Sequence, residues 1–255
     1  MKDFLTISAS SLLTFQRCSQ QYKWQFLDEL PQDPGTASLH TIFGSAIHKC
    51  MELHFKHGIE VIELKGSWKV LFLTLCSEIK NLNEPSKSEL KKFIDKGYVY
   101  LDNLEKMGLR WKNFKVLSVE GYYKFPYTNV FVPNVFLSGR MDLLLGNDDM
   151  VVCLDWKTAK SKENDVENNI QLTFYIYFMS MIYDKYVLEQ FHAGLAYPFD
   201  CEILFTQRKS FEKLFDKIDK MLERIANKDF KKEPKMNFRP DDCHFCQYKT
   251  TCNSK

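Results

Sequence analysis

The strongest constraint on the fold of this chain comes from two β-rich apolar runs, residues 138–145 and 151–158, on either side of a short polar segment. That segment contains glycine, asparagine and two aspartates, which favour tight turns. Strand-forming runs separated by such a turn predict a β-hairpin. The fold must therefore accommodate two adjacent antiparallel strands near the middle of the chain.

The predicted hairpin gathers charged side chains on one face. If residues 146–149 form the loop, Asp142 lies opposite Cys153. Side chains two residues apart on a strand share a face, so Asp155 and Lys157 are expected on the same side as Asp142. The two carboxylates would then be diagonal neighbours about 7–8 Å apart at Cα. Carboxylates that lean together from this separation can share a divalent cation such as Mg²⁺ or Mn²⁺.

An ordinary hairpin with a surface ion pair is the alternative interpretation, because Arg140 is expected to face Asp155. An Asp-x-Lys sequence is common by itself. The hairpin therefore needs support from residues elsewhere in the chain before it indicates catalysis.

Composition limits the class of protein. The chain has 255 residues, 45% of them hydrophobic, which is enough to bury a full core. The sequence has neither a secretory signal nor an 18-residue apolar stretch, so we expect a cytoplasmic protein with no membrane partner. The net charge of +2 is nearly neutral, so nucleic-acid binding would have to come from local patches.

Hydrophobic periodicity predicts helices and strands in an α/β order. Helices are expected over residues 8–26, 41–57, 61–82, 86–110, 163–184 and 209–228, and strands over 116–123, 130–137 and 190–205 in addition to the hairpin. We interpret residues 50–112 as a helical elaboration before the sheet.

Two helical pairs supply further polar groups. Gly44 and His48 lie four residues apart, so they share a helix face, and the missing side chain of Gly44 would allow that face to approach a sheet closely. Gln171 and Tyr175 have the same spacing on a helix after the hairpin. Each pair has an ordinary structural interpretation when taken alone.

Four cysteines form a separate signal. Cys243, Cys246 and Cys252 cluster near the C-terminus, and Cys18 lies near the N-terminus. In a reducing compartment such a set indicates a metal site more than disulfides. The thiolate chemistry fits either tetrahedral zinc or an iron–sulfur cluster. The other four cysteines have no such spacing and are expected in the core.

The order and spacing of these motifs resemble the RecB-type branch of the PD-(D/E)XK nucleases. The split cysteine set resembles the iron–sulfur variant of that branch, which includes CRISPR-associated iron–sulfur exonucleases and the nuclease domain of AddB-like recombination proteins. The resemblance implies one nuclease domain over residues 1–255, with a restriction-endonuclease-like core. In that core a central mixed β-sheet is flanked by helices. It also implies a [4Fe–4S] cluster that joins residue 18 to residues 243–252.

The resemblance assigns roles to the site residues. The expected ligands of Mg²⁺ or Mn²⁺ are His48, Asp142, Asp155 and the backbone carbonyl of Trp156. The expected catalytic residues are Asp142, Asp155, Lys157, Gln171 and Tyr175. Lys157 would orient the attacking water and offset charge in the transition state. Glu120 matches an acid found on the preceding strand of relatives, and an ordinary edge-strand carboxylate is an equal alternative.

DNA, with a preference for single-stranded ends, is the expected substrate, and a helicase or CRISPR integrase is the expected protein partner. No phosphate-binding Gly-x4-Gly-Lys-Ser/Thr sequence occurs, so unwinding would come from that partner. Basic residues with fewer acidic neighbours than those of helix 209–228 are expected along the approach to the site: Lys160, Lys162, Lys231, Lys232, Lys235 and Arg239. A basic stripe on the helix 209–228 is interpreted as a solvated face with intrahelical ion pairs.

Two other classes remain open from the residues alone. One is a nucleic-acid-binding or scaffold subunit that uses a nuclease fold for docking. The intact charges of Asp142, Asp155 and Lys157 argue against it, because burying like charges is costly. The other is a structural protein stabilised by zinc.

Overall fold

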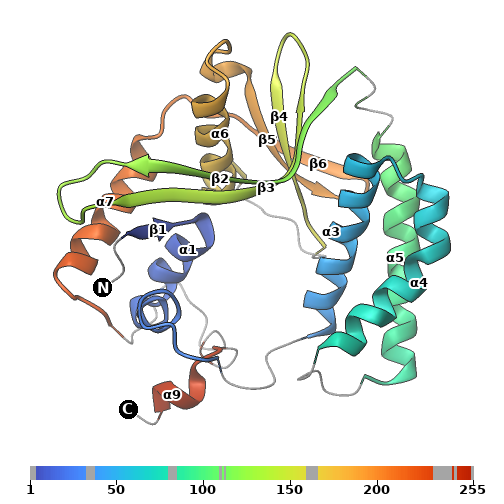
Figure 1. The fold of residues 1–255 in the computed structure, drawn as a ribbon, viewed down its shortest axis with the longest axis horizontal. Helices are drawn as coiled ribbons and strands as arrows, with labels where there is room; N and C mark the ends of the chain where they lie inside the picture. The colour runs from blue at the N-terminus through green and yellow to red at the C-terminus, as the bar shows by residue number, and fades with distance from the viewer. Residues whose placement is uncertain are drawn as a thin grey trace. The chain divides into compact units, whose positions relative to one another are not determined.

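The computed structural model describes residues 4–32, 38–79, 85–108, 111, 113–158, 166–231, 243 and 246–253. The chain divides into two compact units, and its helices and strands are labelled in Figure 1. Unit 1 comprises residues 1–36, 123–139 and 210–255, and unit 2 comprises residues 37–122 and 140–209.

The sheet of unit 2 is mixed. Its first strands are the C-terminal part of β3 (Val135–Gly146) and the N-terminal part of β2 (Lys115–Tyr127), which pairs with β3. Next to β3 come β4 (Val151–Trp156), β5 (Phe191–Tyr197) and β6 (Glu202–Thr206). β4 runs antiparallel to β3 and parallel to β5, and β6 runs antiparallel to β5. Every residue of β4 is buried, which explains why its sequence is largely a continuous apolar run.

Among its described residues, unit 2 has four α-helices beside this sheet: α3 (Leu39–His57), α4 (Val61–Glu78), α5 (Lys87–Gly108) and α6 (Ile170–Ile182). Two short 3₁₀ segments, η3 (Val166–Asn168) and η4 (Leu188–Gln190), lie between strands β4 and β5 along the chain. Helices α3, α4 and α5 lie side by side (Figure 1). The predicted mixed sheet flanked by helices is therefore confirmed.

The ends of α3 follow from its sequence. The Ser38 hydroxyl accepts a hydrogen bond from the Thr41 N–H at 3.3 Å and caps the N-terminus. Gly58, with a left-handed φ of 68°, ends the helix. Between these caps, Phe43 packs edge-on against Trp68, Phe72 and Tyr100 from the other two helices. This aromatic cluster holds the three helices together and fixes the helix that carries His48.

Unit 1 is built from the two ends of the chain. In it, β1 (Leu5–Ile7) pairs in parallel with the start of β3, beginning with Leu5 opposite Val135. The helical segments are α1 (Ala9–Arg17), α2 (Ser19–Tyr22), the π-helix η1 (Lys23–Leu27), α7 (Glu212–Ala226) and α9 (Lys249–Asn253). None of the described helices is long and apolar enough to cross a membrane.

The hairpin register differs from the prediction by two residues. Leu143 pairs with Leu154 and Gly146 pairs with Val151, so residues 147–150 form the loop. The Asn147 side chain decides this, because its oxygen accepts backbone N–H groups of residues 149 and 150, both at 2.9 Å. A shift of two residues leaves every side chain on its predicted face.

Two other boundaries are corrected. The predicted strand 130–137 begins only at Val135, because the preceding residues form a bend in which the Asn129 side chain binds two backbone N–H groups. The predicted helix 8–26 is interrupted at Cys18, whose backbone is extended with φ −153°. The sequence shows no helix breaker there.

A matched pair of glycines tests the packing of α4 against α5. A Cβ at Gly97 would lie 2.0 Å from the buried Trp68 ring, whose N–H is tied to the Ile94 carbonyl at 2.9 Å. Gly97→Ala should therefore lower the free energy of unfolding by about 1–3 kcal/mol. A Cβ at the exposed Gly66 would have no neighbouring atom within 4 Å. Gly66→Ala should therefore raise the free energy of unfolding by about 0.5–1 kcal/mol. Urea unfolding measures both, and equal effects would contradict this packing.

Candidate active site

Asp142 and Asp155 lie on the paired strands β3 and β4. Continuing the observed register by one residue sets them directly opposite each other. Only 7% of Asp142 and 3% of Asp155 is exposed. Directly opposed residues are closer than the diagonal neighbours that were predicted, so the repulsion between the two carboxylates is stronger.

The environment of Asp142 makes its charge costly. Burial raises its pKa to about 7, and the neighbouring Asp155 contributes to the rise. Two groups oppose this shift. The Trp156 backbone N–H donates to Asp142 Oδ2 at 2.8 Å, and His48 attracts the carboxylate electrostatically.

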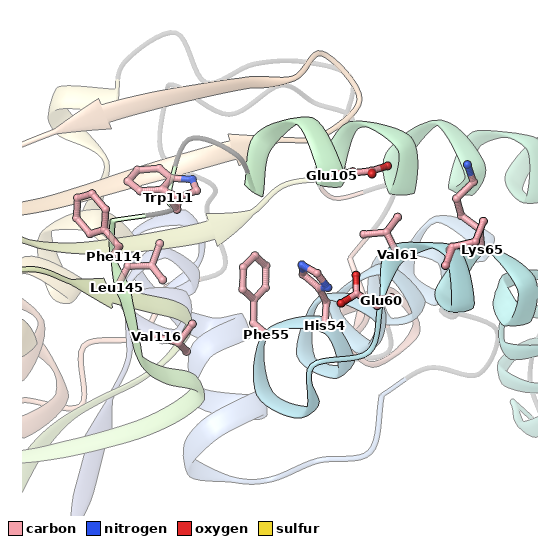
Figure 2. Close-up of a pocket in the computed structure, with 11 residues that line it drawn as sticks. His54, Phe55, Glu60, Val61, Lys65, Glu105, Trp111, Phe114, Val116 and Leu145 are labelled. Carbon is pink, nitrogen blue, oxygen red and sulfur yellow. The ribbon is translucent and has the colours of Figure 1, made fainter.

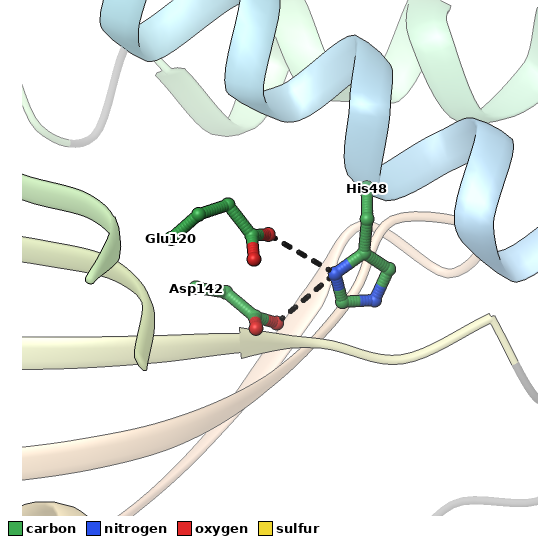
Figure 3. Close-up of side chains that lie close together, drawn as sticks. All are labelled: His48, Glu120 and Asp142. Carbon is green, nitrogen blue, oxygen red and sulfur yellow. Dashed lines mark ion pairs between the residues drawn. The ribbon is translucent and has the colours of Figure 1, made fainter. Parts of the chain in front are cut away.

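His48 completes a cluster with Glu120 and Asp142 (Figure 3). Its Nδ1 lies 3.5 Å from Glu120 Oε1 and 3.5 Å from Asp142 Oδ2. Its Nε2 lies 3.2 Å from the Trp156 carbonyl. Burial lowers the pKa of His48, but the hydrogen bond to Glu120 and the charges of Asp142 and Asp155 outweigh it, so the net shift is upward.

Glu120 reaches this cluster from β2 through an unusual backbone conformation. Its φ is +51°, in the left-handed region, although it lies within a strand. A non-glycine residue in this region is strained by about 1–3 kcal/mol and commonly marks a functional position. Arg140 lies 3.8 Å from Glu120, which corrects the predicted pairing of Arg140 with Asp155.

Asp155 is held by the three other predicted side chains. Its Oδ1 accepts hydrogen bonds from Gln171 Nε2 at 2.7 Å and from the Tyr175 hydroxyl at 2.9 Å. Gln171 and Tyr175 lie one turn apart on α6, as their spacing predicted. The pKa of the Tyr175 hydroxyl is raised by burial and by Asp155, so it remains a donor to the carboxylate.

Lys157 lies on the other side of Asp155. Its Nζ is 2.6 Å from Asp155 Oδ2 and donates to Gln171 Oε1 at 3.0 Å. Apart from this ammonium, the buried Oδ2 has no hydrogen-bond partner among the described residues. The pair thus leaves a carboxylate oxygen and an ammonium next to each other and available for further contacts.

The backbone around Lys157 is clamped from both sides. Its N–H donates to the Ala196 carbonyl of β5 at 2.8 Å. The following carbonyl, of Thr158, accepts from the Tyr100 hydroxyl at 2.9 Å and from Lys96 Nζ at 3.0 Å. Lys96 and Tyr100 come from α5, so the predicted helical elaboration fixes the end of the strand that carries Lys157. Nothing in their sequence pattern indicated this role.

Helix α3 approaches this strand end less closely than predicted at Gly44. A Cβ there would lie 3.4 Å from Thr158 Oγ1, which is ordinary van der Waals contact. The missing side chain is therefore not required for the approach. Gly44 instead lines a cavity of about 570 Å³ together with His48, Glu120 and Arg140. Lys49 and Lys56 also line it, and both are ion-paired with a third lining residue, Glu52, at 2.7 and 3.3 Å.

The cluster suits a divalent cation. One nitrogen of His48 and one carboxylate oxygen each from Glu120 and Asp142 lie within 4.8 Å of one another. Asp155 is outside this set but supplies the buried Oδ2 beside the Lys157 ammonium. The predicted Trp156 carbonyl lies beside His48 Nε2. Oxygen and imidazole ligands are those that Mg²⁺, Mn²⁺ and related ions accept, and a cation would relieve the repulsion between the buried acids.

The four predicted cysteine ligands lie in unit 1, and all are free thiols. Cys18 forms the junction between α1 and α2, where its Sγ accepts the Gln21 N–H at 3.4 Å. Burial raises the pKa of Cys246, and the nearby Cys18, Cys243 and Cys252 raise it further. Cys246 thus interacts electrostatically with the other three, but among the described residues these cysteines form no group of three with sulfurs within 4.8 Å of one another.

The structure describes only part of the predicted set of cations along the approach to the site. Lys160, Lys162, Lys232, Lys235 and Arg239 lie outside the described residues. Lys231 lies in unit 1, where its backbone N–H donates to Ser19 Oγ at 2.8 Å. On α7, the Lys220–Asp216 ion pair at 2.8 Å agrees with a solvated basic face.

A mixed sheet flanked by helices, with a histidine and buried carboxylates together, defines a class of metal-dependent nucleases with a restriction-endonuclease-like fold. The chain matches the family model described as the PD-(D/E)XK nuclease superfamily over residues 6–253, and it belongs to that superfamily. A comparison with curated proteins finds no significant match.

Among solved structures, the chain is similar to the crystal structure of SSO0001. The two share 15% sequence identity with a TM-score of 0.47, over 100% of this chain and 89% of the other. A structural similarity of this size supports no conclusion about function.

The raised pKa of Asp142 predicts how stability depends on pH. The unfolded carboxyl titrates near pH 4, so between about pH 4 and 7 the folded state holds more protons and stability falls as the pH rises. The raised pKa of His48 acts in the same direction, since its stabilising charge is lost as the pH rises through the folded value.

In protein dialysed free of divalent ions, Asp142→Asn should therefore gain stability relative to wild type between pH 5 and 8, by about 1–3 kcal/mol. Urea unfolding across this range measures the difference. Asp148→Asn, in the exposed hairpin loop, is the control and should track wild type. If the free energy of unfolding changes with pH in the same way for Asp142→Asn and wild type, Asp142 is not a buried acid with a raised pKa.

Proposed function

We propose that this metal-dependent nuclease is a deoxyribonuclease of the RecB-type branch that removes nucleotides from single-stranded DNA ends. The proposal rests on the proximity of His48, Glu120 and Asp142 to the Asp155–Lys157 pair. Asp142 and Asp155 lie on the adjacent strands β3 and β4. A phosphodiesterase needs ligands for a divalent ion and a cation beside them, and this group supplies both. The preference for single-stranded ends rests on the motif resemblance to iron–sulfur exonucleases.

The proposed metal ligands are His48, Glu120, Asp142 and Asp155, with the Trp156 carbonyl as a further candidate. A bound Mg²⁺ or Mn²⁺ supplies Lewis-acid chemistry, by acidifying water and offsetting charge on the phosphate. With a cation bound, His48 would keep its proton on Nε2, which lies 3.2 Å from the Trp156 carbonyl, and would lose the Nδ1 proton so that the Nδ1 lone pair faces the ion. Glu120 enters this ligand set because its strained backbone aims it at His48.

Lys157 is the proposed catalytic cation. Asp155 and Gln171 hold its ammonium in place, so its position costs little further ordering when substrate binds. From there it donates to the attacking water or to a phosphate oxygen, and its charge offsets the charge that develops in the transition state. Gln171 and Tyr175 orient Asp155, while Lys49, Lys56 and Arg140 line the cavity through which the phosphates approach.

Cleavage of end-labelled DNA tests the assignment. With anaerobically purified protein and Mg²⁺ or Mn²⁺, Asp155→Ala should lower the rate on single-stranded DNA by about a thousandfold or more, because a cation ligand and the partner of Lys157 are both lost. Glu120→Gln should lose most activity and Asp148→Asn none. Cleavage by Asp155→Ala at the wild-type rate would refute the site.

Circular single-stranded DNA distinguishes an exonuclease from a nuclease that also cuts within a strand. An exonuclease leaves the circle intact, whereas cleavage of the circle would show an endonuclease with the same site. DNA binding by wild type without any cleavage would favour a nucleic-acid-binding subunit that retains the fold. Pathway and partners follow the same resemblance: CRISPR adaptation, recombination or phage DNA metabolism, with a helicase or integrase.

For the cysteines, the proposal is a [4Fe–4S] cluster bound by Cys18, Cys243, Cys246 and Cys252, with zinc as the alternative. What supports it is the electrostatic interaction of Cys246 with the other three cysteines of unit 1, which adds to burial in raising the pKa of Cys246. Thiolates in mutual repulsion are stabilised by a bound cationic centre. The choice of iron and sulfide over zinc rests on the motif resemblance.

Metal analysis and visible absorbance of anaerobically purified protein test this cluster without any activity assay. Wild type should contain iron and sulfide and absorb in the visible region, and Cys246→Ser should lose both. Cys76→Ser, a half-buried cysteine of unit 2, is the matched control and should retain them. Zinc without visible absorbance would identify the alternative, and neither metal in wild type would refute the site.

A further inference from the structure

A second cavity of unit 2, of about 380 Å³, is lined by none of the residues proposed for cleavage. It lies among the end of α3, the start of α4, the end of α5 and the start of β2 (Figure 2). Its volume is in the range of sites for small molecules, which begins near 300 Å³. The proposed nuclease activity does not account for it.

One end of this cavity is aromatic. Phe55, Trp111 and Phe114 surround it together with the aliphatic side chains of Val116 and Leu145 (Figure 2). The Trp111 ring packs edge-on against Phe114, with centroids 5.2 Å apart. Its N–H is buried and has no hydrogen-bond acceptor among the described residues. Flat aromatic walls suit a planar ligand.

The other end is rich in hydrogen-bond acceptors and in negative charge. Glu60 and Glu105, both exposed to solvent, line this side of the cavity (Figure 2). His54 Nδ1 donates to the Ile59 carbonyl at 2.8 Å, which leaves its Nε2 as an acceptor. The only lysine that lines the cavity among the described residues, Lys65, is paired with Asp102 and also interacts electrostatically with Glu105. These groups repel a phosphate and favour a ligand that donates hydrogen bonds.

We propose that this cavity binds an amine-bearing nucleobase, with its ring against the aromatic end and its amino group directed at the Glu60 and Glu105 carboxylates. Carboxylates pair with the exocyclic amino groups of bases, and aromatic side chains stack on base rings. The base can come from a free nucleoside or from a DNA strand, and the sugar lies toward solvent.

The cavity is separated from the proposed active site by one aromatic contact. Phe55 stacks on Trp156 with ring centroids 5.9 Å apart and an interplanar angle of 17°. The backbone of Trp156 contacts Asp142 and His48. The base site is therefore adjacent to the active site without sharing a side chain with it, and the two can be tested apart.

Calorimetric titration of the full chain with adenosine tests the proposal. Adenosine should bind, and thymidine, which lacks an exocyclic amine, should bind at least about tenfold more weakly. Glu105→Ala should weaken adenosine binding by about tenfold, because one charged acceptor is lost. Glu63→Ala, an exposed glutamate of α4 that does not line the cavity, is the control and should bind as wild type does.

A variant of the active site distinguishes the two sites. Asp155→Asn should abolish cleavage and leave adenosine binding unchanged, so failure of the proposed nuclease function does not affect this result. In that background, a short single-stranded oligonucleotide that contains adenine should compete with adenosine if the base comes from a strand, and should fail to compete if it comes from a free nucleoside. Three results would overturn the proposal: no adenosine binding at millimolar concentration, equal binding of thymidine, or loss of binding in Asp155→Asn.

Discussion

The repulsion between two opposed, buried carboxylates is the interaction on which the site depends. Asp142 and Asp155 face each other from adjacent strands with almost no exposure to water, and the pKa of Asp142 rises to about 7 as a consequence. Such a pair costs stability unless cations and hydrogen-bond donors surround it. His48, Lys157 and the Trp156 N–H provide this environment, and a divalent ion would complete it.

Several secondary-structure elements of unit 2 contribute contacts to this environment. Helix α3 carries His48, helix α6 carries Gln171 and Tyr175, and β2 carries Glu120. Helix α5 contributes indirectly, because Tyr100 and Lys96 hold the Thr158 carbonyl next to Lys157. A site assembled from so many elements depends on the packing of the three helices on the sheet. The aromatic cluster around Phe43 therefore supports the chemistry as well as the fold.

Local patterns predicted those parts of the fold that are determined by local physics. The helix over residues 41–57, the strand pair around residue 198 and the face shared by the hairpin acids follow from periodicity and turn residues. The hairpin register was wrong by two residues, because the Asn147 side chain closes the loop one residue later on each strand than composition indicated. The interruption at Cys18 was also missed, since the residues around it have ordinary helix propensities.

The sequence by itself determined the alternation of helices and strands, the placement of Asp142 and Asp155 on one face of the hairpin and the order of the motifs that identify the superfamily. These depend on residue spacing along the chain. Only the tertiary structure decided that Glu120 joins His48 and Asp142, that Tyr100 and Lys96 clamp the strand end, and that a cavity lies behind Phe55. Contacts between residues tens of positions apart depend on how elements pack and on strained backbone such as Glu120, and local pattern carries no record of either.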